Sequence, residues 1–283
     1  MTASDAGDRS NSAQRRSRSY LLPVEDTEFL LRDEMRSIRF ALEYGKAEML
    51  LRDWGVRSTV VVFGSARILP PDVAANLVAA ADGGKAKADA RRQSELSRWY
   101  AEARRFGRLV SERGGALAKD DRPRDNVIAT GGGPGIMEAA NRGAADAGAP
   151  SIGFNISLPH EQEPNAYSTP DLTFRFHYFA MRKMHLAMRA NALAVFPGGF
   201  GTLDELFEIL TLQQTRKAPP MPIVLFGKSY WQGVVNFQGM VEAGMLAAED
   251  LELFDIVDDA EEAWSIMTRR GLKAHTADPP PGP

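Results

Sequence analysis

Short, uninterrupted apolar runs alternate along the chain with longer segments in which apolar residues recur every three or four positions. The runs cover residues 58–63, 126–130, 151–156, 192–196 and 221–226, and a weaker one covers 251–257. Continuous apolar runs rich in β-branched residues are typical of strands buried on both faces of a parallel sheet. We therefore expect each run to be a strand, most clearly the first, Ser58 to Phe63.

The segments between these runs have helical spacing. They cover residues 96–110, 136–147, 178–189, 202–212 and 231–240, and a closing helix covers 260–267. Strands alternating with helices of this length form βαβ units with right-handed crossovers. The pattern predicts an α/β fold: a Rossmann-like, doubly wound, mainly parallel sheet with helices on both faces.

The remaining segments predict how the chain is organised around this domain. Residues 1–20 are rich in serine and arginine, and 271–283 contain three consecutive prolines, so we expect both to be disordered tails. Residues 21–57 form an N-terminal helical segment, with an amphipathic helix over 28–51. The Rossmann-like domain covers 58–270, and within it the alanine-rich stretch 70–93 is predicted to be an exposed, partly helical insertion.

Composition excludes several functions. The chain has 283 residues, and its 34 basic and 37 acidic residues give a net charge of −3, which disfavours a uniformly basic nucleic-acid binder. Without cysteine there is no disulfide or thiol nucleophile, and the four histidines lack metal-ligand spacing, so we expect no metal. No apolar stretch is long enough to span a membrane, and we expect a cytoplasmic protein with neither nucleic acid nor membrane as partner.

Three predicted strands end in glycine-bearing turns that lead toward helices. These turns are Gly64-Ser65-Ala66-Arg67, Gly131-Gly132-Gly133-Pro134-Gly135, and Pro197-Gly198-Gly199-Phe200-Gly201-Thr202. Backbone N–H groups at such turns can form a concave anion site, which the helix dipole favours further. Tight turns also need glycine for purely structural reasons. Three of them at one sheet edge nevertheless favour a phosphorylated ligand.

Standard nucleotide motifs do not fit these turns. The dinucleotide fingerprint fails because Ile136 stands where its third glycine is required. The Gly227-Lys228-Ser229 triplet resembles the end of a P-loop, but Pro222 occupies the position of the upstream glycine. The sequence thus lacks the cradles for hydride transfer and for nucleoside-triphosphate hydrolysis.

The third turn continues into Asp204 and Glu205, for which two roles are open. Thr202 and Glu205 have the spacing of a capping box, in which both side chains bond to backbone N–H groups at the helix start. Alternatively, Glu205 faces a ribose and stabilises positive charge that develops on it, or guides a water molecule, as carboxylates do in glycoside cleavage. A carboxylate near a bound anion is repelled by it, and this unfavourable energy is easier to understand if the carboxylate acts on the ligand.

A pair of cations, Arg182-Lys183, is predicted near the start of another helix. Cations there oppose the helix dipole, so helix stability does not explain them. They are either a solvated basic patch or groups directed at an anionic ligand, for which the planar guanidinium of Arg182 is well suited.

These residues resemble the Lonely Guy (LOG) family, formerly labelled "possible lysine decarboxylase". Its signature P-G-G-x-G-T-x-x-E matches Pro197 to Glu205 at every fixed position, and its arginine–lysine pair matches Arg182-Lys183. The family's glycine-rich turn matches Gly131 to Met137. The flanking segments 152–155, 158–162 and 174–177 are similar to the longer bacterial members. Asp204 replaces a frequent glutamate, and Ala180 stands where short members carry histidine.

The resemblance implies a phosphoribohydrolase that cleaves AMP, a cytokinin riboside 5′-monophosphate or both, as in cytokinin biosynthesis, without a cofactor. It implies Arg182 and Glu205 as the catalytic pair. The implied substrate-binding residues are Gly64, Ser65, Gly131, Gly132, Gly133, Lys183, Gly198, Gly199, Gly201, Thr202 and Asp204. It further implies a homodimer or a higher even homo-oligomer. The alternative is a non-catalytic Rossmann protein that binds a nucleotide or a phosphorylated cofactor.

Overall fold

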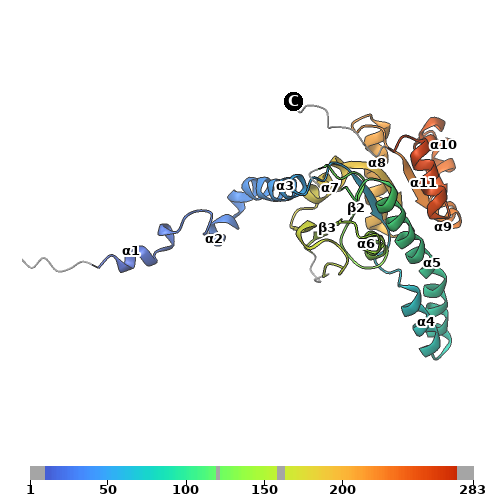
Figure 1. Cartoon of the computed structure of the whole chain (residues 1–283), viewed down its shortest axis with the longest axis horizontal. Coiled ribbons are helices and arrows are strands. Elements are labelled where there is room, and N and C mark those ends of the chain that lie inside the picture. Colours follow the sequence, from blue (N-terminus) through green and yellow to red (C-terminus); the bar gives the residue numbers. More distant parts are fainter. Residues whose placement is uncertain (1–9, 119–121, 158–162, 273–283) are drawn as a thin grey trace, which may run out of the picture. The chain divides into compact units, whose positions relative to one another are not determined.

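A computed structural model describes residues 10–118, 122–157 and 163–272 (Figure 1). The chain divides into two compact units, residues 1–46 and 47–283. The N-terminal helical segment was expected over residues 21–57, and its residues 47–57 lie in the second unit. Tail residues 1–9 and 273–283 lie outside the described residues.

The first unit consists of short helical elements. They are α1 (Ser12–Arg16), the 3-10 helix η1 (Arg18–Tyr20), α2 (Thr27–Leu30), the 3-10 helix η2 (Asp33–Met35) and the first part of α3 (Arg36–Asp53). Residues 12–20, expected to be disordered, are therefore largely helical, although neither α1 nor η1 contains a buried residue. The amphipathic helix expected over 28–51 is interrupted, since α2 ends at Leu30 and α3 begins only at Arg36.

The second unit is built on a seven-stranded sheet in which every pairing is parallel. The strands are β1 (Thr59–Phe63), β2 (Val127–Thr130), β3 (Ser151–Ile156), β4 (Thr173–Phe176), β5 (Ala190–Val195), β6 (Ile223–Phe226) and β7 (Asp255–Val257). Their order is β4-β3-β2-β1-β5-β6-β7. In the central register, Val61 pairs with Ala129 on one side and Leu193 on the other. The chain thus winds outward from β1 in both directions, which confirms the doubly wound α/β fold.

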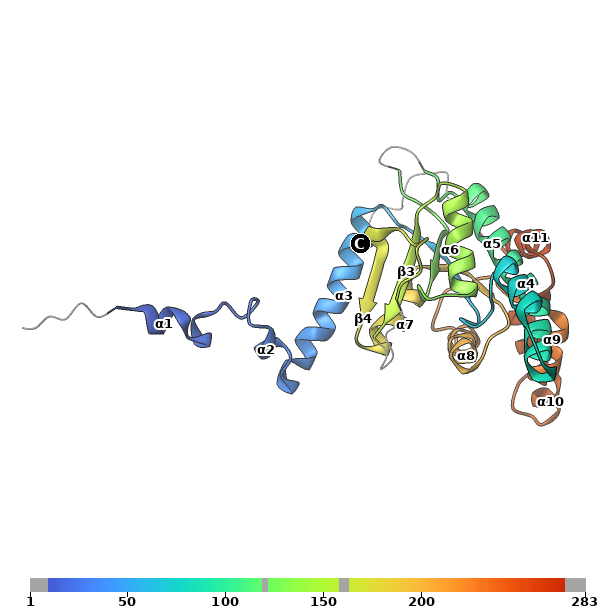
Figure 2. The ribbon, with the colours of Figure 1, turned by 90° about the horizontal axis from the view of Figure 1, so that it is seen from below.

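Helices cover both faces of this sheet (Figure 2). They are α4 (Pro71–Ala80), α5 (Gly84–Arg113), α6 (Ile136–Asp146), α7 (Phe179–Met188), α8 (Phe200–Gln214), α9 (Lys228–Val234), α10 (Phe237–Glu242) and α11 (Ala260–Arg269), with the 3-10 helices η3 (Pro170–Leu172) and η4 (Ala248–Leu253). Val60 and Val62 face a core shared with α5, α6 and α11, whereas Val61 faces one shared with α7, α8 and α9. No helix in the described part of the chain is both long and apolar enough to cross a lipid bilayer.

Two strands at the edges of the sheet differ from the prediction. The apolar runs did not predict β4, because this edge strand alternates buried Phe174 and Phe176 with exposed Arg175 and so lacks a continuous apolar run. The weak strand expected over 251–257 is shorter, since η4 occupies its first residues. The stretch 70–93 forms α4 and the start of α5.

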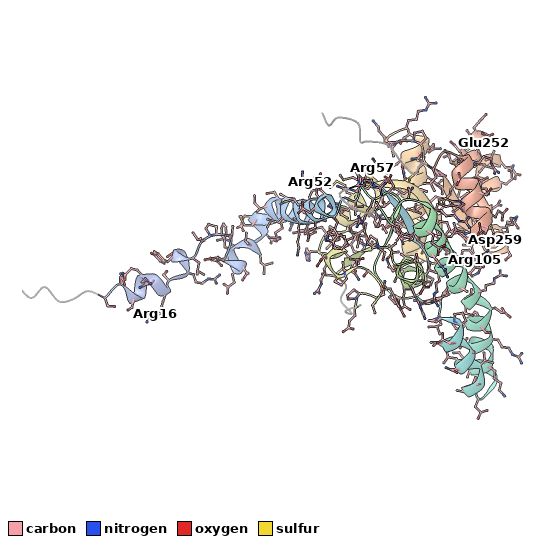
Figure 3. The ribbon with its side chains drawn as sticks, in the orientation of Figure 1. Arg16, Arg52, Arg57, Arg105, Glu252 and Asp259 are labelled. Atoms are coloured by element: carbon pink, nitrogen blue, oxygen red, sulfur yellow. The ribbon has the colours of Figure 1, made fainter. Side chains whose placement is uncertain are left out.

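A charged network lies at the amino ends of the central strands. Arg57, labelled in Figure 3, precedes β1, and its Nε lies 2.8 Å from a carboxylate oxygen of the buried Asp125. The Ser58 hydroxyl donates to the same carboxylate at 3.0 Å and accepts from the Asn126 N–H at 3.0 Å. These contacts fix one end of the sheet and leave its carboxyl end for ligands.

Helices α5 and α6 cross in close contact at two glycines. A Cβ atom added to Gly107 would lie 2.3 Å from the backbone oxygen of Ala140, and one added to Gly143 would lie 2.0 Å from that of Arg104. Both glycines are buried. The close approach of the two backbones therefore depends on residues without side chains.

Candidate active site

A cavity of about 260 Å³ lies at the carboxyl ends of β1 and β5. The starts of α6, α7 and α8 complete its wall. Eight of the predicted site residues line it: Gly64, Ser65, Arg182, Gly199, Gly201, Thr202, Asp204 and Glu205. The structure thus brings together the first and third glycine turns and both members of the predicted catalytic pair.

A buried ion pair between Glu205 and Arg182 forms the centre of this site. Glu205 is 5% exposed, and Arg182 Nη1 lies 3.2 Å from its Oε1. The Arg182 Nε donates to the backbone oxygen of Phe154 at 2.8 Å, so the guanidinium is held from two directions. Removing both charges from water costs free energy, so a pair buried this deeply contributes little net stability. A functional role explains its presence better.

Burial changes the ionisation of both groups. Burial raises the pKa of Glu205 above its ordinary value of 4.5, and the nearby cations Arg182 and Lys183 only partly offset this. Burial likewise lowers the pKa of Arg182, against the attraction of Glu205. A guanidinium is so basic that Arg182 stays cationic at neutral pH. The site therefore holds one fixed cation beside a carboxylate that binds its proton more readily than an exposed one.

The third glycine turn shows that the capping-box interpretation of Glu205 is wrong. The N-cap residue of α8 is Gly199, which has no side chain that could accept a capping hydrogen bond. Thr202 lies within the first helical turn and is not the N-cap residue. The carboxylate of Glu205 bonds to Arg182 instead of to the backbone at the helix start. The first N–H groups of an α-helix lack the partner that later ones have within the helix, and here the first turn borders the cavity at Gly199 and Gly201. The Thr202 N–H is already used, since it donates to the Gly199 oxygen at 3.0 Å.

Packing explains why Gly198 does not line the cavity. A Cβ atom at Gly198 would lie 2.1 Å from the Thr202 hydroxyl oxygen, so the turn folds directly onto the threonine. Tyr230 donates its hydroxyl to the Gly198 carbonyl at 2.5 Å and fixes the turn from the other side. Gly198 thus shapes the turn that positions Thr202.

The second glycine turn also lies behind the cavity wall. Gly131 abuts Arg182, since a Cβ there would be 2.7 Å from Nη2. Gly132 has a φ of +71° and packs on Asn155, and the Gly133 carbonyl accepts from the side chain of Asn165. None of the three glycines is among the described residues that line the cavity. In this structure the turn makes room for the arginine.

Lys183 is directed away from the cavity. Its Nζ lies 2.8 Å from Asp204 Oδ2 and 2.9 Å from Glu208 Oε2. These two carboxylates also raise the pKa of Lys183, against its partial burial. Asp204 borders the cavity as well, so it connects Lys183 to the site.

Five further residues line the cavity that were not among the predicted site residues: Phe63, Ala66, Arg67, Met137 and Phe179. Ala66 and Arg67 belong to the first glycine turn, so their position in the sequence was a usable signal. No side chains of His, Asp or Glu in the described residues group in threes that could hold a metal ion.

Fold and site together define a Rossmann-like α/β protein with a buried glutamate–arginine pair at the carboxyl end of its sheet. Comparison with known proteins makes the relationship more specific. The family model described as "Possible lysine decarboxylase" matches residues 137–267, a range that includes both members of this pair. The similarity to the LOG family that the sequence predicted is thereby confirmed, although flanking segment 158–162 lies outside the described residues.

A curated plant protein is similar over half of the chain. It is the "probable cytokinin riboside 5'-monophosphate phosphoribohydrolase LOG4" of Oryza sativa subsp. japonica, 27% identical over 146 residues. The match covers 50% of this chain and 62% of that relative's length.

Two solved structures are similar at lower sequence identity. One is the molybdenum cofactor binding protein of Rippkaea orientalis, with 17% identity, a TM-score of 0.46, and coverage of 75% of this chain and 96% of that one. The other is the X-ray structure of the structural-genomics protein TM1055, with 19% identity, a TM-score of 0.46, and coverage of 75% and 99%.

Proposed function

We propose that the protein hydrolyses the N-glycosidic bond of nucleoside 5′-monophosphates, releasing the free base and ribose 5-phosphate. The observation that carries this proposal is the Glu205 carboxylate, buried and held by Arg182 in a cavity that the first turn of α8 borders. The site thus offers a carboxylate, a fixed cation and an anion-binding helix start within one small cavity. The name of the rice relative supports the same reaction class.

The chemistry follows from the charges of these groups. The 5′-phosphate binds the start of α8 around Gly199 and Gly201, as anions bind helix starts. The Thr202 N–H already donates to the Gly199 oxygen at 3.0 Å, so Thr202 contributes its hydroxyl group. As the bond between C1′ and the base nitrogen breaks, its electron pair leaves with the base and positive charge develops on the ribose. Glu205 stabilises that charge or orients the water whose oxygen bonds to C1′. The attacking water loses one proton and the departing base gains one, so the step balances as hydrolysis. Arg182 positions the phosphate or the departing base.

We propose AMP and cytokinin riboside 5′-monophosphates as the substrates. The test is incubation of the full chain with AMP and, separately, with isopentenyl-adenosine monophosphate, followed by chromatographic detection of free base and ribose 5-phosphate. We expect both products in equal amounts from at least one substrate. Tight binding of both nucleotides without any product would favour the non-catalytic carrier instead.

The raised pKa of Glu205 predicts an acidic limb in the pH profile. Both roles proposed for this residue need the carboxylate, so protonation abolishes activity. Because burial raises the pKa above 4.5, kcat/KM should fall as the pH drops through a midpoint higher than 4.5. The profile is measured between pH 4 and 9 with AMP. A profile flat down to pH 4.5, with the protein still folded by circular dichroism, would contradict a catalytic carboxylate at this position.

We also propose a homodimer or a higher even assembly that uses the surface beside the site. Phe200, at the start of α8, is 93% exposed, and Phe179 is 53% exposed. Leu203, Phe207 and Leu212 lie with Phe200 along a hollow on α8. Sedimentation velocity at micromolar concentration should show a dimer or larger species, and Phe200→Asp should shift it toward monomer. A monomeric wild-type protein would count against this surface as an interface.

A further inference from the structure

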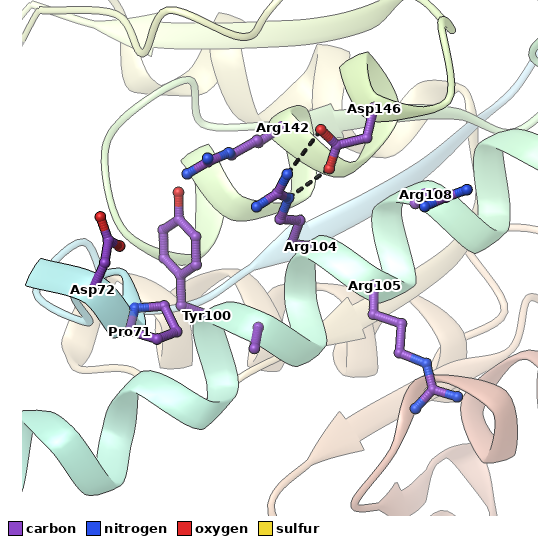
Figure 4. Close-up of a pocket in the computed structure, with 9 residues that line it drawn as sticks. Pro71, Asp72, Tyr100, Arg104, Arg105, Arg108, Arg142 and Asp146 are labelled. Carbon is purple, nitrogen blue, oxygen red and sulfur yellow. Dashed lines mark hydrogen bonds and ion pairs between the residues drawn. The ribbon is translucent and has the colours of Figure 1, made fainter. Parts of the chain in front are cut away.

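A second, larger cavity of about 540 Å³ lies between α4, α5 and α6 (Figure 4). Its lining residues are Pro71, Asp72, Tyr100, Ala101, Arg104, Arg105, Arg108, Arg142 and Asp146. None of them lines the candidate active site. The volume lies within the range of small-molecule pockets. Four of the nine residues are arginines and two are acids, so the cavity has an excess of positive charge.

One of these arginines is held in a fixed orientation by a carboxylate. The Nε and Nη2 of Arg104 donate to the two oxygens of Asp146 at 2.5 and 2.9 Å. This two-pronged pairing leaves Nη1 available, because a guanidinium has five N–H donors in a rigid fork. Figure 4 shows the carboxylate of Asp146 facing the guanidinium of Arg104, with dashed lines between them. Asp146 therefore orients Arg104 and leaves part of its donor capacity unused.

A second arginine lies between two tyrosines. The Arg142 guanidinium lies 5.2 Å from the centre of the Tyr167 ring, and hydrogen bonding to Tyr100 raises the pKa of Arg142. The buried Tyr100 donates its own hydroxyl to Glu138 at 2.6 Å, so its oxygen is free to accept. Within the described part of the chain, Arg142 is thus a partly buried, well-supported cation that makes no ion pair with a carboxylate.

The arrangement of these cations points to an anion between them. In Figure 4 the guanidinium groups of Arg104 and Arg142 lie near each other, on the same side of α5 as the Tyr100 hydroxyl, whereas Arg105 points away. Two neighbouring cations repel each other, and the carboxylate of Asp146 pairs with Arg104. A bound phosphate would offset the repulsion that remains and use the unused donors of both guanidinium groups.

We propose that this cavity binds a phosphorylated small molecule, with Arg104 and Arg142 as the phosphate-binding residues. The phosphate oxygens accept hydrogen bonds from the two guanidinium groups. Asp72, which lines the same cavity from α4, can accept from a hydroxyl or amino group of the same ligand. This site is separate from the proposed glycosidase site and stands whether or not the chain hydrolyses nucleotides.

Calorimetric titration of the full chain tests the proposal with two probes, inorganic pyrophosphate and magnesium-free ATP. We expect pyrophosphate to bind, since it presents the phosphate chemistry alone. ATP should compete with it for the same site. Tighter binding of ATP would identify the ligand as an organic phosphate, and equal binding would identify a free phosphate anion. Failure of both probes to bind at millimolar concentration would overturn the proposal.

Matched variants locate the binding. Arg142→Ala should weaken pyrophosphate binding by about tenfold or more, the effect of losing a charge-assisted hydrogen bond. The double variant R104A/D146A should weaken it similarly without changing the net charge. Arg91→Ala removes an exposed charge from α5 outside the cavity and should leave binding within about twofold.

Two further variants test the geometry of the site and its location. Arg142→Lys keeps the charge and fills similar space, so weaker binding in a folded R142K protein shows that the fork geometry matters. Arg182→Ala alters the candidate active site and should retain pyrophosphate binding. If R91A weakened binding as much as R142A, the attraction would be nonspecific. If R182A abolished binding while R142A did not, the anion would belong to the first site. Either result would overturn the proposal.

Discussion

Replacing Glu205 by glutamine should lower the rate of base release from a nucleoside 5′-monophosphate by about 100- to 10,000-fold. Glutamine has nearly the same shape and can still accept a hydrogen bond from Arg182, but it carries no charge to stabilise the ribose or to orient a water molecule. AMP binding, measured by calorimetry, should remain largely intact, because the phosphate is held by the start of α8. Single-turnover measurement of free adenine gives the rate.

The matched control for this prediction is Glu208→Gln on the same helix. Glu208 bonds to Lys183 and does not line the cavity, so E208Q should keep its activity within about threefold. Near-normal turnover in E205Q would refute the catalytic assignment. Equal losses in E205Q and E208Q would instead indicate that the charge of α8 as a whole matters.

Replacing Gly143 by alanine should destabilise the second unit by about 3 kcal/mol, the upper end of the usual cost of overpacking. The added methyl group would lie 2.0 Å from the backbone oxygen of Arg104, and a backbone atom cannot move aside as a flexible side chain can. Helices α5 and α6 would have to separate over their whole contact. Denaturant unfolding followed by circular dichroism measures the change in the free energy of unfolding.

Gly233→Ala provides the control for this substitution. Gly233 lies in α9, and a Cβ there would meet no described atom within 4 Å. Alanine favours the helix over glycine by up to about 1 kcal/mol, so G233A should leave the free energy of unfolding unchanged or raise it. If G143A were as stable as G233A, the two helices would not depend on a glycine at their crossing.

The central strands could be predicted from the sequence because their burial is symmetric. β1 is buried on both faces, so it appears as a continuous apolar run that needs no knowledge of its neighbours. β4 lies at the edge of the sheet and alternates buried with exposed residues, a weaker signal over only four positions. The two edge strands were accordingly the weakest predictions: β4 was missed, and β7 was expected over a longer range than it covers.

The direction of the Glu205 side chain depended on tertiary structure. The spacing between Thr202 and Glu205 fits a capping box only if Thr202 is the N-cap residue. If the helix starts earlier, the side chain of Glu205 is available for the site. The start at Phe200 turns Glu205 toward Arg182, which comes from a different helix. Sequence spacing within one helix cannot contain that information, because the partner lies 23 residues away.

The sequence by itself determined the doubly wound α/β class and the meeting of the first and third glycine turns at the carboxyl end of the sheet, since both follow from local apolar periodicity and from the shared direction of parallel strands. Only the tertiary structure decided which glycines border the cavity and which merely make room for Arg182. It also brought Arg104 and Arg142 together from two helices. In the sequence these arginines look like ordinary solvated charges, because spatial proximity between distant residues is set by helix packing and not by local pattern.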